Sequence, residues 1–188
     1  MYDVKPVTSA YITACGPTCL KMLLDFYGHD VALEDLISEC GVGIAGCTAN
    51  DLKRVGNAHG LDITNWKMDM EGALTADRPM ILWWRYQHFV VFCGLNDKGE
   101  PVICNPSSGR FPISLDAFKR AFSGIALCNG KPEDYVPRAT KAMAKGEYFN
   151  LNNELCKAIA PIANGAMLTI NTNYIVTSVE AELAALNK

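Results

Sequence analysis

The sequence predicts an α+β domain in which N-terminal helices pack on an antiparallel sheet, followed by a C-terminal extension. Residues 1–60 carry apolar residues at the spacing of amphipathic helices. Residues 61–129 instead carry short apolar runs separated by turn residues, which is typical of successive strands. Helices and strands fall in separate blocks, and this order favours an antiparallel sheet over alternating βαβ units.

Three helices are predicted in the first third of the chain. The first begins at Cys15 and ends at Gly28, and it buries one stripe: Cys19, Leu20, Leu23, Leu24 and Tyr27. The segment VALEDLISEC, residues 31–40, predicts a second short helix. Thr48 and Asp51 have the spacing of a capping box, so we expect a third helix that ends at Gly60.

The middle of the chain predicts strands joined by turns and short helices. Strands are expected at residues 61–66, 79–84, 88–95, 101–105 and 124–129. A short helix is expected within residues 68–77, and a second one over residues 114–122, capped by Ser114. Residues 96–100, NDKGE, form a turn, so that the runs HFVVFCGL and PVICN pair as a hairpin.

The segment GKPEDYVPR, residues 130–138, contains two prolines and predicts a domain boundary. We therefore expect a domain at 1–130 and a C-terminal extension at 131–188, an arm or small added unit. Within it, residues 152–160 and 178–188 have helical character, and residues 166–178 favour a strand. This extension is the expected contact site for a protein partner or a second copy of the chain.

Composition excludes several classes of function. The net charge of -3, with no block of Lys and Arg, argues against a nucleic-acid partner. No apolar run approaches the roughly 18 residues of a membrane span. The N-terminus lacks the features of a secretory signal, so the eight cysteines are expected to be reduced thiols in the cytoplasm, or alternatively in a virion or other large assembly. With no C-x-x-C pair and three histidines, we expect no metal and no organic cofactor.

Cys15 is the candidate nucleophile. It lies at the expected N-terminus of a helix, where free backbone N–H groups and the helix dipole favour a thiolate. Gly16 permits close approach of backbone and substrate, and Pro17 suits the first helical turn. The other cysteines are expected to be buried core residues, since free cysteine is among the most buried residue types.

His88 is the candidate general base, and Asn105 is its candidate orienting partner. His88 is a polar residue at the mouth of an apolar strand, whereas His29 follows a glycine in a loop and His59 lies at a helix end. If residues 88–95 and 101–105 form a hairpin, His88 and Asn105 lie at the same end of the sheet. An Asn oxygen then accepts the imidazole N–H.

The chain resembles the C39 peptidases and C39-like domains, papain-like cysteine peptidases best known for cutting leader peptides from bacteriocin precursors. The resemblance covers about residues 8–128, through the stretches CGPTCLKMLLDFYG, GCTANDLKRVGNAHGLD, RPMILWWRYQHFVVFCGL and PVICNPSSGRFPISLDAFKRAFSGIAL. It implies a papain-like fold in which Cys15 is the nucleophile, His88 the base and Asn105 the third member. It also implies cleavage after Gly-Gly or other small residues, in a narrow groove.

Two positions depart from the family pattern. The family usually has Asp where this chain has Asn105, and its oxyanion-hole Gln is replaced here by Ser9. Loss of one oxyanion donor costs about a hundredfold to a thousandfold in turnover. Gly16, Trp84 and Gln87 are the expected groove residues, with Trp83 and Tyr86 as further candidates for its walls.

Three classes of function are compatible with these residues. The first is peptide-bond hydrolysis by a thiol mechanism, such as leader-peptide processing. The second is a binding or structural module with weak or no catalysis, for example a transporter accessory or a virion component, which the missing Gln favours. The third is acyl transfer by a transglutaminase-like relative, which would use the same three residues.

Overall fold

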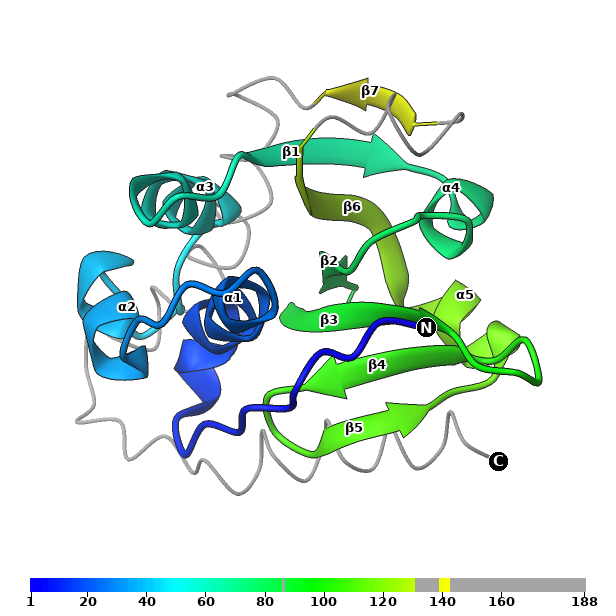
Figure 1. Ribbon diagram of the computed structural model, residues 1–188, viewed down its shortest axis with the longest axis horizontal. Coiled ribbons are helices and arrows are strands. Elements are labelled where there is room, and N and C mark those ends of the chain that lie inside the picture. Colours follow the sequence, from blue (N-terminus) through cyan, green and yellow to red (C-terminus); the bar gives the residue numbers. More distant parts are fainter. Residues whose placement is uncertain (86, 131–138, 143–188) are drawn as a thin grey trace, which may run out of the picture.

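An antiparallel sheet forms the centre of the molecule (Figure 1), in a computed structural model that describes residues 1–85, 87–130 and 139–142. Its strand order is β5-β4-β3-β2-β6-β1-β7. The strands are β1 (Ile63–Met68), β2 (Met80–Trp84), β3 (His88–Leu95), β4 (Pro101–Asn105), β5 (Gly109–Pro112), β6 (Phe122–Asn129) and β7 (Ala139–Ala142). The helices are the 3-10 helix η1 (Ile12–Ala14), α1 (Cys15–Phe26), α2 (Leu33–Glu39), α3 (Ala49–Ala58), α4 (Met70–Leu74) and α5 (Leu115–Ala121).

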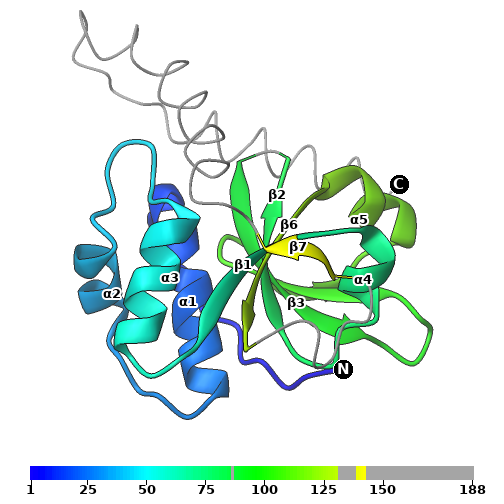
Figure 2. The same ribbon diagram turned by 90° about the horizontal axis from the view of Figure 1, so that it is seen from above.

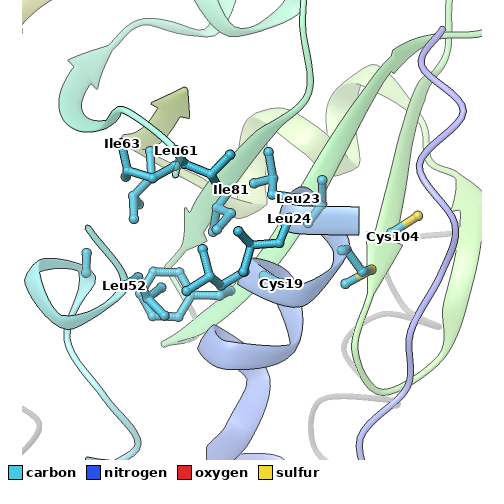
Figure 3. Packing of buried hydrophobic residues seen from close by; sticks show 14 of the residues in the cluster. Cys19, Leu23, Leu24, Leu52, Leu61, Ile63, Ile81 and Cys104 are labelled. Carbon is cyan, nitrogen blue, oxygen red and sulfur yellow. The ribbon is translucent and has the colours of Figure 1, made fainter. Parts of the chain in front are cut away.

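Helices cover both faces of the sheet. Figure 2 shows α1, α2 and α3 gathered on one side, with α4 and α5 on the other. The first group encloses a core with Trp83 and Phe89, whose rings meet edge to face with centroids 4.4 Å apart. Figure 3 shows side chains of this core from α1, α3, β1 and β2 packed against one another. The second group covers a core that contains Trp84, Phe92 and Phe118.

The α+β fold expected from the sequence is confirmed. Thr48 and Asp51 form the reciprocal capping box that starts α3, and the Ser114 side chain caps α5 by accepting from the Ala117 N–H. The turn between β3 and β4 closes through a backbone bond from Asn96 N–H to the Glu100 carbonyl, 3.0 Å long. Local signals of this kind predicted every one of these elements.

Strands β5 and β6 differ from the prediction, and η1 and β7 were not predicted. The Ser-Ser-Gly turn leads into a further strand, β5, which pairs with β4. The segment Gly109–Pro112 lacks apolar alternation and ends in proline, so nothing local marks it as a strand. Strand β6 begins at Phe122, directly after α5, and not at Gly124. None of the helices in the described residues is long and apolar enough to cross a membrane.

Strand β7 is the one described part of the predicted extension, whose other expected elements lie outside the described residues. It pairs with the edge of β1, with Trp66 opposite Ala142 and Met68 opposite Ala139. A cut at the predicted boundary after residue 130 would therefore remove β7, the strand that covers the β1 edge of the sheet. Exposed edges are sites of aggregation.

We expect a chain that ends at residue 130 to remain folded and to keep a reactive Cys15, because the sheet without β7 retains both cores. Iodoacetamide labelling and thermal unfolding measure this. A chain that ends at residue 142 is the matched control, since it keeps β7. Aggregation of the shorter chain alone means that the β1 edge needs its cover, and aggregation of both means that the extension completes the fold.

Candidate active site

Cys15 is the first residue of α1, reached through the single turn of η1. The Thr18 hydroxyl donates to the Ala14 carbonyl over 2.8 Å, which fixes the first turn of α1 without using its N-terminal N–H groups. The sulfur of Cys15 accepts hydrogen bonds from the backbone N–H groups of Gly16 and Phe89. The thiol is half-buried, so it is held in place and remains accessible.

His88 is the first residue of β3 and lies opposite Trp84 of β2. Its ring is 4% exposed, and its Nε2 lies 2.9 Å from Asn105 Oδ1. Asn105 ends β4, and its Oδ1 also accepts the backbone N–H of Ser107 at 2.9 Å. Because a backbone N–H only donates, Oδ1 is an acceptor, and His88 Nε2 must carry the proton that it donates. Nδ1 is then the ring nitrogen left for Cys15.

The Cys15 thiol and the His88 ring are hydrogen-bonded and shift each other's pKa in opposite directions. Burial raises the pKa of Cys15, but the hydrogen bond and charge of His88 and the two backbone N–H donors outweigh it, so the pKa lies below its ordinary value. Burial lowers the pKa of His88, yet the bond and charge of Cys15 and the bond to Asn105 raise it. The arrangement therefore favours a thiolate beside an imidazolium.

The hairpin geometry expected from the sequence accounts for this meeting. Val91 pairs with Cys104 and the strands run antiparallel, so the start of β3 lies beside the end of β4. The other two histidines lie elsewhere: His59 Nε2 is 2.9 Å from a carboxylate oxygen of Glu39, and the His29 ring packs against Gly60. Of the three histidines, His88 is therefore the one placed at Cys15.

Ser9 lies close to this site, but its hydroxyl is already bonded. Its backbone N–H donates to the carbonyl of Pro106, the residue after Asn105, over 3.0 Å. Its Oγ donates to the Tyr11 carbonyl and accepts the Tyr11 N–H in a local turn. The oxyanion role of Ser9 stays a prediction, and it would require this turn to open.

The three expected groove residues occupy different environments. Trp84 is 2% exposed within the second core, and this burial does not support a place on a groove wall. Gln87 is exposed and adopts φ 59° beside His88. Gly16 is buried, and a Cβ there would lie 2.8 Å from Cys47 Sγ, so the glycine permits close packing of α1. Tyr86 lies outside the described residues.

Sequence reasoning missed two contributors to the surroundings of Cys15. The Phe89 N–H donates to the thiol, and a backbone donor leaves no trace in the residue type. Cys47 lies against Gly16, although a glycine after the nucleophile is the signal that something packs closely there. The described residues contain no group of three or more His, Cys, Asp or Glu side chains suited to hold a metal ion.

The profile of the peptidase C39 family matches residues 4–134. The chain belongs to this family. The resemblance expected from the sequence is thereby confirmed, and C39 family members are cysteine peptidases. The match spans the whole set of elements that carries Cys15, His88 and Asn105.

Two curated relatives are transport proteins far longer than this chain. The lactococcin-G-processing and transport ATP-binding protein LagD of Lactococcus lactis subsp. lactis is 25% identical over 142 residues, which are 72% of this chain and 20% of that protein. The colicin V secretion/processing ATP-binding protein CvaB of Escherichia coli is 26% identical over 113 residues, 60% of this chain and 16% of the relative. The chain thus spans a fifth or less of the length of these relatives.

Two solved structures share the fold. A double glycine motif protease from an AMS/PCAT transporter, in complex with the leader peptide, superposes with a TM-score of 0.62 at 29% identity, covering 66% of this chain and 89% of that one. The peptidase domain of Streptococcus ComA gives a TM-score of 0.61 at 22% identity, covering 66% of this chain and 96% of that one.

We expect Cys15 to be the most reactive thiol of the chain near neutral pH, because its pKa is lowered and the thiol is only half-buried. The pKa of Cys104 is lowered as well, but that thiol is fully buried. Brief treatment with limiting iodoacetamide followed by peptide mapping measures this. In a His88→Ala variant the imidazolium is lost, the effect of burial remains, and labelling of Cys15 at pH 7 is expected to slow at least about tenfold. Faster labelling of the buried Cys93 or Cys104 than of Cys15 contradicts the assignment.

Proposed function

We propose that the chain hydrolyses peptide bonds by a thiol mechanism in which Cys15, His88 and Asn105 act together, and that its substrate is a leader peptide ending in Gly-Gly. The observation that supports the chemistry is the continuous set of hydrogen bonds from the Cys15 thiol through His88 to Asn105 Oδ1. The similarity to a double glycine motif protease supports the substrate class.

In the proposed reaction, His88 Nδ1 takes the proton of Cys15, and the thiolate attacks the carbonyl carbon of the scissile bond. The tetrahedral intermediate collapses when the leaving amine receives that proton from His88, which leaves a thioester on Cys15. His88 then removes a proton from water, the resulting hydroxide attacks the thioester, and the Cys15 thiolate departs. Throughout, Asn105 Oδ1 holds the Nε2–H and fixes the ring direction.

Stabilisation of the oxyanion is the step for which this chain departs from its family. We expect the backbone N–H of Cys15 to serve as one donor, because it lies at the N-terminus of α1, where the helix dipole favours negative charge. A side-chain donor is expected only if Ser9 leaves its turn with Tyr11.

The bonded state of the Ser9 hydroxyl favours a second candidate function, a C39-like binding module with weak or no turnover. The Ser9 hydroxyl is bonded in both directions to the Tyr11 backbone, so no free side-chain donor replaces the family's Gln at this position. Such a module would bind a peptide beside Cys15 without cutting it.

A peptide library varied at the two positions before the scissile bond tests the proposal. We expect cleavage of substrates with Gly-Gly there and at least about a hundredfold less with Phe or Arg, because a narrow groove excludes bulky side chains. Strong turnover of Phe or Arg substrates and none with Gly refutes the narrow groove. Cleavage of no library member, with Cys15 still labelled by iodoacetamide, supports the binding module.

A further inference from the structure

The thiols of Cys15, Cys47 and Cys40 follow one another in space near Gly16. The Cys15 sulfur accepts the Gly16 N–H, and the Cys47 sulfur lies 2.8 Å from the point that a Cβ on Gly16 would occupy. Cys15 and Cys47 therefore both lie beside the same residue. Cys47 is hydrogen-bonded to Cys40 and also interacts with Cys15, so it is the thiol that neighbours both of the others. The order is Cys15, Cys47, Cys40.

The segment between α2 and α3 holds Cys40 and Cys47 together. Cys40 is the C-terminal cap of α2, and Cys47 precedes Thr48, the N-terminal cap of α3. Between them the chain folds back on itself, with Gly43 and Gly46 exchanging two backbone hydrogen bonds of 3.0 Å each. Both thiols are thus fixed by local structure, and neither depends on a mobile arm.

The segment between α2 and α3 also packs against η1, the turn that leads to Cys15. Gly46 has a positive φ of 79°, and a Cβ there would lie 3.2 Å from the Thr13 carbonyl of η1. Cys47 is half-buried like Cys15, whereas Cys40 is buried. Solvent therefore reaches both Cys15 and Cys47, whereas Cys40 is enclosed.

We propose that Cys47 and Cys40 form a resolving pair that returns an oxidised Cys15 to its thiolate. The oxidant is a peroxide, and the net reaction converts two thiols and one hydrogen peroxide into the Cys40–Cys47 disulfide and two waters. The inference rests on the proposed function in one respect, namely that Cys15 is the reactive thiolate of the chain.

The proposed oxidation takes place in three steps. The Cys15 thiolate attacks hydrogen peroxide, forms sulfenic acid and releases hydroxide, which takes up a proton as water. The Cys47 thiol condenses with this sulfenic acid, so that an S–S bond forms and water leaves. The Cys40 sulfur, after losing its proton, attacks the Cys47 sulfur of that bond, and the Cys15 thiolate is the leaving group. That proton accounts for the neutralised hydroxide.

The environment of each sulfur gives the exchange its direction. A thiol of lower pKa leaves faster in thiol–disulfide exchange. The hydrogen bond of Cys40 and burial raise the pKa of Cys47, while the pair with His88 lowers that of Cys15. Of the two sulfurs in a Cys15–Cys47 disulfide, Cys15 is therefore the better leaving group, and the bond passes to Cys40.

A second thiol pair provides an internal reference. Cys93 and Cys104 lie on adjacent strands with their sulfurs 3.5 Å apart, and both are fully buried. The N-terminal residues cross above them, with the Tyr2 N–H bonded to the Cys93 carbonyl and the Val4 carbonyl near Cys104. This pair is closely spaced, and neither sulfur is among the groups that interact with Cys15, although Cys19 interacts with both Cys15 and Cys104.

Treatment of the full chain with one equivalent of hydrogen peroxide, followed by non-reducing peptide mapping, tests the proposal. We expect a Cys40–Cys47 disulfide, free Cys93 and Cys104, and a Cys15 that still reacts with iodoacetamide. Cys40→Ser is expected to stop at a Cys15–Cys47 disulfide whose Cys15 returns with dithiothreitol. In Cys47→Ser, one equivalent is expected to leave Cys15 as sulfenic acid. With excess hydrogen peroxide this variant is expected to lose Cys15 labelling irreversibly as sulfinic acid forms, at least about tenfold more than the parent under the same excess.

These measurements follow disulfide formation and not peptide cleavage. A failure of the resolving pair can therefore be told apart from a failure of the proposed peptidase function. A Cys93–Cys104 disulfide formed before Cys40–Cys47, or a Cys15–Cys19 disulfide in the parent, overturns the resolving pair. Equal sulfinic acid at Cys15 in the parent and in Cys47→Ser also overturns it, and the parent result needs no variant to fold. Cys15 that is inert to both peroxide and iodoacetamide overturns the proposed function as well.

Discussion

Replacing Cys15 with serine is expected to reduce peptide cleavage at least about ten-thousandfold while leaving the fold intact, because the reaction then loses its nucleophile. A serine hydroxyl has a far higher pKa than a thiol, so it forms no ion pair with His88 at neutral pH. The substitution replaces one sulfur with a smaller oxygen at a half-buried position at the start of α1, at the edge of the first core.

Cleavage of a Gly-Gly leader peptide by parent and variant, with thermal unfolding of both, measures this. The matched control is Cys19→Ala, which removes the thiol one turn further along α1. Cys19 is fully buried, so this variant is expected to lose about 1 to 2 kcal/mol of stability and to keep its activity per folded molecule. A Cys15→Ser variant that retains more than about one hundredth of the parent rate removes Cys15 from the reaction.

Local sequence signals predicted most of the elements and the candidate site. Several features are each encoded within a few neighbouring residues, so they can be recognised without knowledge of the fold. They are the capping box of Thr48 and Asp51, the Asn96 turn and the helix start at Cys15. The hairpin then brings His88 to Asn105 by strand geometry alone, since a tight turn fixes which strand ends meet.

Contacts between residues distant in the sequence were not predictable in the same way. The order of the sheet places β6 between β1 and β2, and no local pattern specifies that insertion. The N-terminal residues are held by Arg110, which donates to the carbonyls of Tyr2 and Val4 from more than a hundred positions away. Cys47 against Gly16 is of the same kind, because it follows from the packing of α3 on α1.

Trp84 illustrates why residue type alone misleads near a site. An aromatic residue four positions before His88 is compatible with a groove wall or with the core, and the sequence has no means to separate them. The register of β2 on β3 places Trp84 opposite His88, among Val90 and Phe92, where α5 covers it. Burial is a property of the assembled layers, and it decides this case.

Replacing Asn105 with alanine is expected to lower peptide cleavage by about a hundredfold to about ten-thousandfold, because His88 then loses the acceptor that fixes its tautomer and direction. Asn105 is fully buried, and its Oδ1 also accepts the Ser107 N–H, so the turn after β4 loses a bond as well. The turnover number per folded molecule and thermal unfolding separate the two effects. An alanine variant that cleaves within about threefold of the parent removes Asn105 from the site.

Asn105→Asp is the matched variant, and its pH profile tests the bond to His88 directly. A carboxylate oxygen accepts the same two N–H groups, so we expect cleavage to be largely retained. Its negative charge also stabilises the imidazolium and raises the pKa of His88 further. Activity requires the Cys15 thiolate and the protonated His88 together, so it rises with pH as Cys15 ionises and falls as His88 loses its proton. The falling limb of the aspartate variant is therefore expected at higher pH than in the parent. The limb set by Cys15 is expected at the same pH or slightly higher, because the added carboxylate repels the thiolate. A falling limb that stays in place means that residue 105 does not contact the His88 ring during turnover.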